Sequence, residues 1–211
     1  KGIMLGELFD REYLIDHLSD VLEFKNLQIT RVYGGEPFSL ESMVEYFDTY
    51  GEILKPYIGD TSAYLRKAAH EGKKILYEAQ LGVLRDIDFG IYPYTSSSSP
   101  LAAYAPIGSG APDIPVNRVI GVVKAYSTCV GEGPFTAEWF GEEAERLRKE
   151  GGEYGAATGR PRRVGPIDLV ATRYGVQMQG ATEVALTKLD ILSYMDSIPV
   201  CAAYECDGEV T

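Results

Sequence analysis

The sequence lacks several features that would place it in large functional classes. It contains no apolar run near the roughly 20 residues that cross a bilayer, and its first residues do not form a secretory signal. Its three cysteines show no metal-ligand spacing, which favours reduced thiols and a cytoplasmic location. Basic residues are scarce, since 20 Lys and Arg stand against 31 Asp and Glu, giving a net charge of -11. The sequence therefore predicts neither membrane insertion nor nucleic-acid binding.

Motifs of several enzyme classes are also missing. There is no Gly-x4-Gly-Lys-Ser/Thr phosphate loop, no Gly-x-Ser-x-Gly nucleophile elbow, and no Cys–His pair with a third orienting group. Asp86 and Asp88 alternate along an extended segment, so they could face one side and bind a metal or act in acid–base chemistry. Such a pair is more often a solvated turn, and we predict no metal site.

The patterns that are present divide the chain into two regions. Apolar residues make up 45% of the sequence, enough for an ordinary core. Helical spacing dominates residues 1–72, with N-caps at Asp10 and Ser39 and a third helix that ends near Gly72. Residues 73–211 are predicted to form part of an α/β nucleotide-binding domain with a mixed sheet. The fold class is therefore α/β, with a helical region followed by a partial sheet domain.

The second region contains strand and helix patterns on either side of a long loop. Residues 79–112 are rich in Gly, Ser, Pro and Tyr, and a loop of this length inside a compact domain is usually functional or mobile. The apolar patterns predict strands over residues 74–78, 183–186 and 200–204, and helices over residues 116–126, 138–150 and 167–179.

Three arginines crowd the glycine-punctuated segment Gly-Ala-Ala-Thr-Gly-Arg-Pro-Arg-Arg at residues 155–163. Arginine presents a planar, permanently charged fork that matches carboxylate and phosphate oxygens two at a time. In an acidic protein this concentration indicates a small anionic ligand. The alternative is that the arginines pair with nearby acids and only support the fold.

Thr187-Lys188-Leu189-Asp190 follows a predicted strand end, where nucleotide sites are common in α/β sheets. A carboxylate at Asp190 can accept two parallel hydrogen bonds from guanine, which adenine cannot donate. The aliphatic stem of Lys188 can lie across the base. The same tetrapeptide could instead cap a helix, and the missing phosphate loop argues against a self-sufficient GTP site.

These pieces occur together with longer motifs in one order. The motifs are EAQLG at residues 78–82, DIDFGIYPY at 86–94 and KAYSTCVGEGPF at 124–135, followed by the arginine segment and LTKLD at 186–190. In this order the chain resembles the adenylosuccinate synthetase family. The resemblance runs over nearly the whole sequence.

The resemblance implies a GTP-dependent ligase of AMP biosynthesis. In this family GTP phosphorylates the 6-oxygen of IMP, and the amine of L-aspartate then displaces that phosphate. Mg2+ accompanies GTP, and the family is homodimeric. The resemblance places the phosphate loop and the catalytic aspartate and histidine before Lys1, and a further guanine-contacting segment after Thr211. We therefore assign no catalytic residue to this chain and expect it to be inactive by itself.

The resemblance also assigns binding roles by position. The residues expected to hold the aspartate carboxylates are Thr158, Arg160 and Arg162. Those expected to bind IMP are Gln80, Ser96, Val130, Gly131 and again Arg160. Those expected to read the guanine of GTP are Lys188 and Asp190.

The sequence departs from the family pattern at three positions near these residues. The IMP-binding glutamine of the family falls on Leu81, with Gln80 one place away, and a one-residue shift can turn a side chain to the other side. Phe89 replaces a histidine and Ala157 replaces a threonine. Two alternatives thus remain beside the ligase: a nonenzymatic module that binds a nucleotide or dicarboxylate, and a family member that uses a different purine nucleotide.

Overall fold

The structure, a computed structural model, describes residues 2–210. The chain divides into two compact units, Lys1–Thr61 and Ser62–Thr211. Within the described residues all strands belong to the second unit. No helix between residues 2 and 210 is long and apolar enough to cross a membrane.

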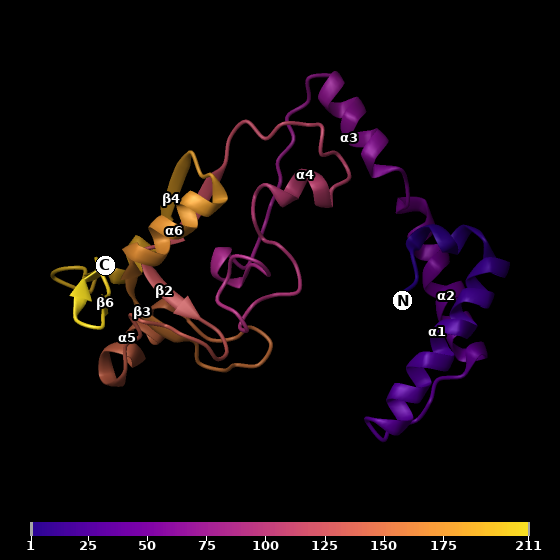
Figure 1. The fold of residues 1–211 in the computed structure, drawn as a ribbon, viewed down its shortest axis with the longest axis horizontal. Coiled ribbons are helices and arrows are strands. Elements are labelled where there is room, and N and C mark those ends of the chain that lie inside the picture. Colours follow the sequence, from indigo (N-terminus) through magenta and orange to yellow (C-terminus); the bar gives the residue numbers. More distant parts are fainter. Residues whose placement is uncertain (1, 211) are drawn as a thin grey trace. The chain divides into compact units, whose positions relative to one another are not determined.

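The first unit is helical. Its elements are η1 (Leu5–Phe9), α1 (Arg11–Arg31), α2 (Leu40–Leu54) and η2 (Lys55–Tyr57). Figure 1 shows α1 and α2 lying side by side, and the two helices are in contact.

Both predicted N-caps of the first unit are confirmed. The side chain of Asp10 accepts a hydrogen bond from the backbone N–H of Tyr13, and Ser39 accepts one from Ser42. Each satisfies a backbone donor that has no partner within its helix. Three leucines at helical spacing form the buried stripe of α1, namely Leu14, Leu18 and Leu22, and Leu8 of η1 is buried as well.

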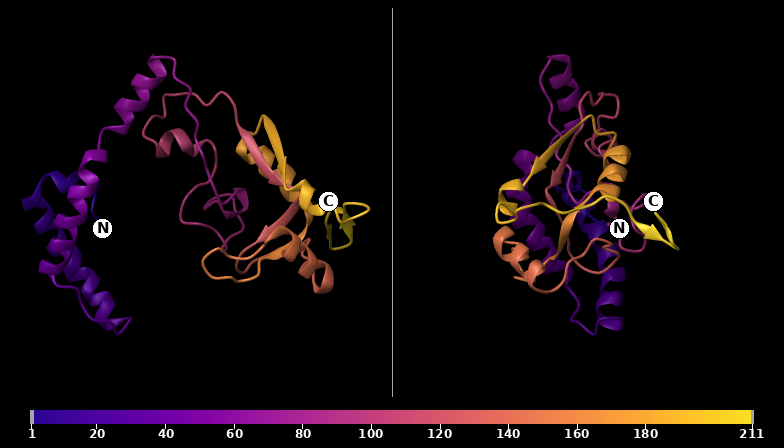
Figure 2. Two further views of the ribbon diagram at one scale, coloured as in Figure 1. Left: turned by 180° about the vertical axis from the view of Figure 1, so that it is seen from behind. Right: turned by 90° about the vertical axis from the view of Figure 1, so that its left-hand side faces the viewer.

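The second unit alternates helices and strands. After α3 (Thr61–His70), which begins at the boundary between the units, the long loop carries only short helices, η3 (Val83–Arg85) and α4 (Tyr104–Gly108). The later helical elements are α5 (Gly141–Gly151), α6 (Leu169–Gln179) and η4 (Leu189–Leu192). Figure 2 shows α6 lying alongside the strands, and it contacts β1, β3 and β5.

The strands form three small sheets. β1 (Ile120–Lys124) pairs in parallel with β4 (Glu183–Thr187). β3 (Arg163–Asp168) lies between β2 (Tyr126–Cys129), which is antiparallel to it, and β5 (Val200–Cys201), which is parallel. The last sheet is a hairpin of β6 (Glu205–Cys206) and β7 (Glu209–Val210). Mixed strand directions with intervening helices confirm the predicted α/β class.

The core of the second unit lies where β2 and β3 meet α5 and η4. Trp139, Ile191 and Met195 pack around its edge. Its buried members are Ala125, Tyr126, Ala144, Leu147, Val164 and Leu192. This core fixes the start of β2 and the start of β3, and the candidate site is built at those two points.

Three predictions of secondary structure were wrong. Residues 116–126 form no helix, because the β-branched residues of β1 pair with β4 instead and the chain then enters β2. Residues 74–78 pair with no strand of the described chain, and Leu76 is 92% exposed. The strand expected over residues 200–204 has only two residues, Val200–Cys201. Short apolar runs do not by themselves separate helix from strand.

The pair Asp86 and Asp88 organises a turn. The Asp86 carboxylate is fully buried and accepts hydrogen bonds from the backbone N–H groups of Asp88 and Phe89, both at 2.9 Å. Ser99 donates a third from its hydroxyl at 2.5 Å. This last bond and the backbone donors hold the pKa of Asp86 below its ordinary value. The two carboxylates therefore do not act as a pair, and Asp86 holds the long loop together.

Candidate functional site

The arginine segment forms a tight hairpin, which we call the arginine hairpin (residues 153–163). At its base the backbone N–H of Arg162 donates to the carbonyl of Glu153 at 2.9 Å, and nearer the tip Gly155 donates to Arg160 at the same distance. Gly159 adopts a φ of 65° and donates back to Gly155 at 2.7 Å. This left-handed position is one that glycine adopts without strain. The tip thus presents Thr158 and Arg160 to solvent.

The three arginines of the hairpin have different partners. Arg163 binds the carboxylate of Glu138 with Nε and Nη2, and Arg162 binds Glu153 through Nη1 at 2.8 Å. The guanidinium of Arg160 is exposed and makes no hydrogen bond or ion pair with any residue between 2 and 210. The pairing interpretation therefore holds for Arg162 and Arg163, whereas the guanidinium of Arg160 has no bonded partner among the described residues.

A buried carboxylate at the base of the hairpin joins three donors. Glu153 is 3% exposed. Its Oε1 accepts from the hydroxyl of Tyr126 at 2.6 Å and from Nζ of Lys124 at 3.1 Å, while Oε2 accepts from Arg162. Nζ of Lys124 also donates to Thr128 at 2.6 Å. No sequence pattern reveals this cluster, because Glu153 lies 29 residues after Lys124 and 27 after Tyr126.

Burial and hydrogen bonding shift the pKa of Glu153 in opposite directions. Burial of Glu153 raises its pKa, but the bonds from Tyr126, Lys124 and Arg162 outweigh burial and keep the pKa below its ordinary value. Burial is the main cause that lowers the pKa of Lys124, and the positive charges of Arg162 and Lys188 act in the same direction. Lys124 therefore lies within electrostatic reach of both the arginine hairpin and the segment after β4.

The segment Lys188–Asp190 follows the carboxyl end of β4, as predicted. Lys124 is in register with Thr187 across the two parallel strands, and the N–H of Ala125 donates to the carbonyl of Thr187 at 2.9 Å. Lys188 has a φ of 61°, a conformation that non-glycine residues rarely adopt and that often marks functional sites. The side chains of Lys188 and Asp190 are exposed and have no bonded partner among the described residues.

The predicted IMP residues fall into two separate places. Gln80 and Leu81 line a small cavity of about 150 Å3 together with residues 98–101 and α4. Leu81 has a φ of 73° and is 62% exposed. Ser96 is held through its backbone N–H, which donates to the carbonyl of Arg85 at 2.7 Å. This cavity is not lined by Val130 or Gly131.

Val130 and Gly131 form a loop after β2 that two arginines hold. Arg85 donates to the carbonyl of Val130 at 3.0 Å, and Arg163 donates to that of Gly131 at 3.3 Å. The side chain of Val130 is 70% exposed. The structure thus brings Gly131 beside the base of the arginine hairpin through Arg163.

No metal centre appears in the described part of the chain. Residues 2–210 contain no group of three or more His, Cys, Asp or Glu side chains that could hold a metal ion.

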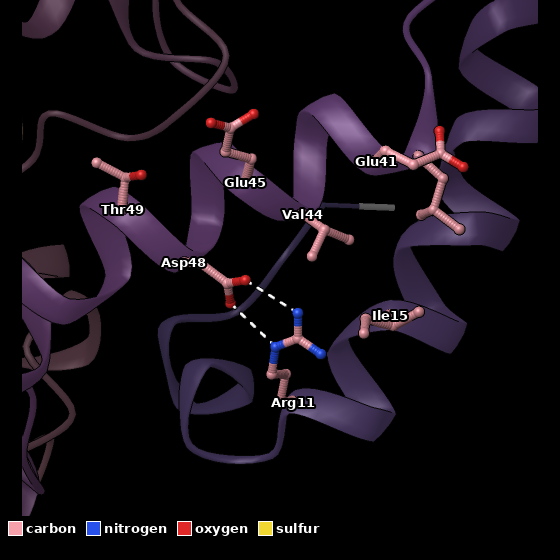
Figure 3. Close-up of a pocket in the computed structure, with 8 residues that line it drawn as sticks. Arg11, Ile15, Glu41, Val44, Glu45, Asp48 and Thr49 are labelled. Atoms are coloured by element: carbon pink, nitrogen blue, oxygen red, sulfur yellow. Dashed lines mark hydrogen bonds and ion pairs between the residues drawn. The ribbon is translucent and has the colours of Figure 1, made fainter.

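A second recess lies in the helical unit, between α1 and α2. It is an open groove of about 430 Å3. Figure 3 shows Arg11 and Asp48 facing each other across it, with the apolar side chains of Ile15 and Val44 nearby. Arg11 donates to Asp48 from Nε at 3.2 Å and from Nη2 at 3.0 Å. No residue that the sequence assigns to a ligand lies in this groove.

Comparison with known proteins identifies a single family. The family described as "Adenylosuccinate synthetase" matches residues 1–211. The chain is 45% identical over 208 residues to the adenylosuccinate synthetase of Bifidobacterium adolescentis, covering 99% of this chain and 49% of that protein. It is 46% identical over 209 residues to that of Caldanaerobacter subterraneus subsp. tengcongensis, with the same coverage.

A solved structure gives the same answer. The structure of fully ligated adenylosuccinate synthetase from Plasmodium falciparum superimposes with a TM-score of 0.88 and 32% identity, over 100% of this chain and 49% of that one. The chain thus spans about half the length of the relatives it matches. The sequence motifs, the mixed α/β fold and these comparisons agree, and the chain belongs to the adenylosuccinate synthetase family.

Proposed function

We propose that this chain provides the dicarboxylate-binding and guanine-reading part of a GTP-dependent ligase that joins IMP and L-aspartate. The family membership and the two exposed, unpaired binding groups support this proposal. The reaction needs a guanidinium that binds the carboxylates of aspartate and a carboxylate that binds guanine. In this chain Arg160 and Asp190 supply these two groups. The reaction belongs to AMP biosynthesis and takes place in the cytoplasm, in a homodimer.

The observation that carries the proposal is the state of Asp190. It is an exposed carboxylate without a partner among the described residues, directly after the carboxyl end of a parallel strand. Ligands of open α/β sheets bind at such ends. Its two oxygens can accept the N1–H and the exocyclic amine of guanine together, while the stem of Lys188 covers the base.

The arginine hairpin supports the second substrate. Thr158 and Arg160 lie exposed at its tip, and Glu153 uses only Nη1 of Arg162, so Nη2 has no bonded partner among the described residues. Two guanidinium groups on one short hairpin match the two carboxylates of L-aspartate. Mg2+ would be bound together with GTP, and no residue of this chain is assigned to it.

Calorimetric titration with GDP, XDP and ADP tests the guanine site. We expect binding of GDP in preference to ADP. Asp190→Asn should lose GDP and gain XDP, because xanthine has a carbonyl at position 2 that accepts from the amide of Asn. Asp196→Asn, an exposed aspartate outside the motif, is the matched control. Equal binding of GDP and ADP, or no change in Asp190→Asn, contradicts the proposal.

A second candidate function is a nonenzymatic module that binds a nucleotide or a dicarboxylate and has lost the IMP site. It is favoured by Leu81, which occupies the family's glutamine position, points largely to solvent and cannot hydrogen-bond a purine nucleotide. Titration with IMP separates the two candidates. Binding that appears in Leu81→Gln and is absent from the unmodified chain favours the module, whereas binding by the unmodified chain favours the ligase.

A further inference from the structure

We propose that Glu153 is a positioning residue: its buried carboxylate fixes the guanidinium of Arg162 and attaches the arginine hairpin to the strand ends beside Lys188. The inference rests on the proposed function for its ligand. Its structural basis is the set of bonds that Glu153 makes to Lys124, Tyr126 and Arg162.

Glu153 is held in place by the core of the second unit and by α5. The hydroxyl of Tyr126 belongs to the core of the second unit, where Tyr126 is 2% exposed. A Cβ on Gly151 would lie 2.7 Å from that hydroxyl, so only glycine leaves room for this arrangement. The backbone N–H of Glu153 donates to the carbonyl of Arg148 in α5 at 2.8 Å. Glu153 is therefore anchored on both its main chain and its side chain.

Arg162 is bound to Glu153 at two points. Its backbone N–H and its Nη1 both donate to Glu153, to the carbonyl and to Oε2 respectively. Two bonds between the same residues fix the main chain and the side chain of Arg162 together. A flexible arginine side chain loses rotamer freedom when it binds a ligand, and a guanidinium that is already held loses less. Glu153 thus pre-organises Arg162 for a carboxylate ligand.

Glu153 also connects to the strand end that precedes the guanine-reading segment, residues 188–190. Oε1 of Glu153 accepts from Lys124, the last residue of β1, which is in register with Thr187. Lys188 follows directly and adopts its left-handed conformation there. A single carboxylate therefore links the base of the arginine hairpin to the strand end from which the guanine-reading segment begins. Arg160, by contrast, lies beyond this link and has no held guanidinium.

The neighbouring pair Arg163 and Glu138 provides a matched control. It is also an arginine bound to a largely buried carboxylate at the base of the same hairpin, with side chains 29% and 14% exposed. Glu138 makes no bond to Lys124 or to Arg162. Loss of the Glu138 charge therefore tests for general weakening of this region without loss of the Glu153 link.

The first experiment needs no ligand. In NMR spectra that resolve the guanidinium nitrogens, Arg162 should show two distinct Nη signals, because its rotation about Nε–Cζ is restricted. In Glu153→Gln these signals should average, and the amide signals of Lys188–Asp190 should shift. In Glu138→Gln the Arg162 signals should stay resolved. Resolved Arg162 signals in Glu153→Gln, or unmoved Lys188–Asp190 amides, overturn the proposal.

The second experiment measures L-aspartate binding in a double-mutant cycle. Glu153→Gln should weaken binding about tenfold, the lower end of what loss of a supporting partner costs at metal ligands. In the Arg162→Met background the same change should have no further effect, because Glu153 acts through Arg162. Additive losses would show a merely structural role and overturn the inference. If the unmodified chain binds no L-aspartate while its Arg162 signals remain resolved, the proposed function fails and the positioning role stands.

Discussion

The groove of the helical unit and the base of the arginine hairpin each contain an arginine bound to a carboxylate. Arg11 and Asp48 face solvent, with side chains 62% and 47% exposed. Arg162 is 35% exposed, and its partner Glu153 only 3%. The pairs have the same chemistry, but only the second has a carboxylate that water cannot solvate. The protein must therefore provide all the partners of Glu153, and the surrounding structure depends on them.

The largest expected effect comes from removing the buried carboxylate. Glu153→Ala should destabilise the second unit by about 3 kcal/mol, because Tyr126 and Lys124 lose their shared acceptor. Trp139 is the only tryptophan and packs against this core, so its fluorescence during urea unfolding reports this unit alone. A change below 1 kcal/mol in the free energy of unfolding would mean that water replaces the Glu153 carboxylate. The buried pair would then contribute no more to stability than the exposed pair of Arg11 and Asp48.

The second effect separates ligand binding from stability. Arg160→Ala should weaken L-aspartate binding by about 1.5–3 kcal/mol, the usual range for hydrogen bonds to charged groups. The same change should leave the Trp139 unfolding curve unchanged, since the side chain of Arg160 bonds no other residue in the described structure. Arg163→Lys, in the structural pair with Glu138, is the control variant. Loss of stability in Arg160→Ala would contradict the division of roles within the hairpin.

This division could not be read from the sequence. The glycine-punctuated run of three arginines predicts either an anion-binding loop or ion pairs that support the fold, but the sequence does not show which arginine has which role. Their partners Glu153 and Glu138 precede the run by distances that match no local motif. Only the turn at Gly159 and the packing of Tyr126 decide which arginine is held and which is available.

The fold itself was predictable in outline because its strongest signals are local. Asp10 and Ser39 cap helices through contacts three residues away, and Gly180 ends α6 in the left-handed conformation expected of a C-cap. The failures were the short apolar runs. β1 depends on its pairing with β4, whose first residue lies 63 positions after the first residue of β1, and no pattern within residues 116–126 contains that information.

The third effect is the response to acid. The folded pKa of Glu153 lies below its ordinary value, so its contribution to stability is complete above the unfolded value and is lost as the pH falls through the folded one. The Trp139 unfolding midpoint should therefore fall as the pH drops below about 4, near the ordinary carboxyl range. Glu153→Gln should flatten this dependence. If the unfolding midpoint of Glu153→Gln falls equally steeply with pH, other carboxylates cause the acid response. The first of these to test is the buried Asp86, with the variant Asp86→Asn.

The smallest effect is expected in the groove of the helical unit. Asp48→Asn removes the charge that Arg11 binds, but both side chains already contact water, and exposed ion pairs contribute little to stability. The helical circular dichroism signal and its thermal midpoint should stay unchanged within error. The pKa of Asp48 is lowered chiefly by its hydrogen bonds from Arg11, so the small contribution of this pair is present above the ordinary carboxyl pKa and is lost in acid, and the variant should remove only that small dependence on pH. A marked loss of helicity would mean that burial is not what distinguishes the two arginine–carboxylate pairs, and that geometry alone, two parallel bonds from Arg11 to one carboxylate, stabilises the contact of α1 with α2.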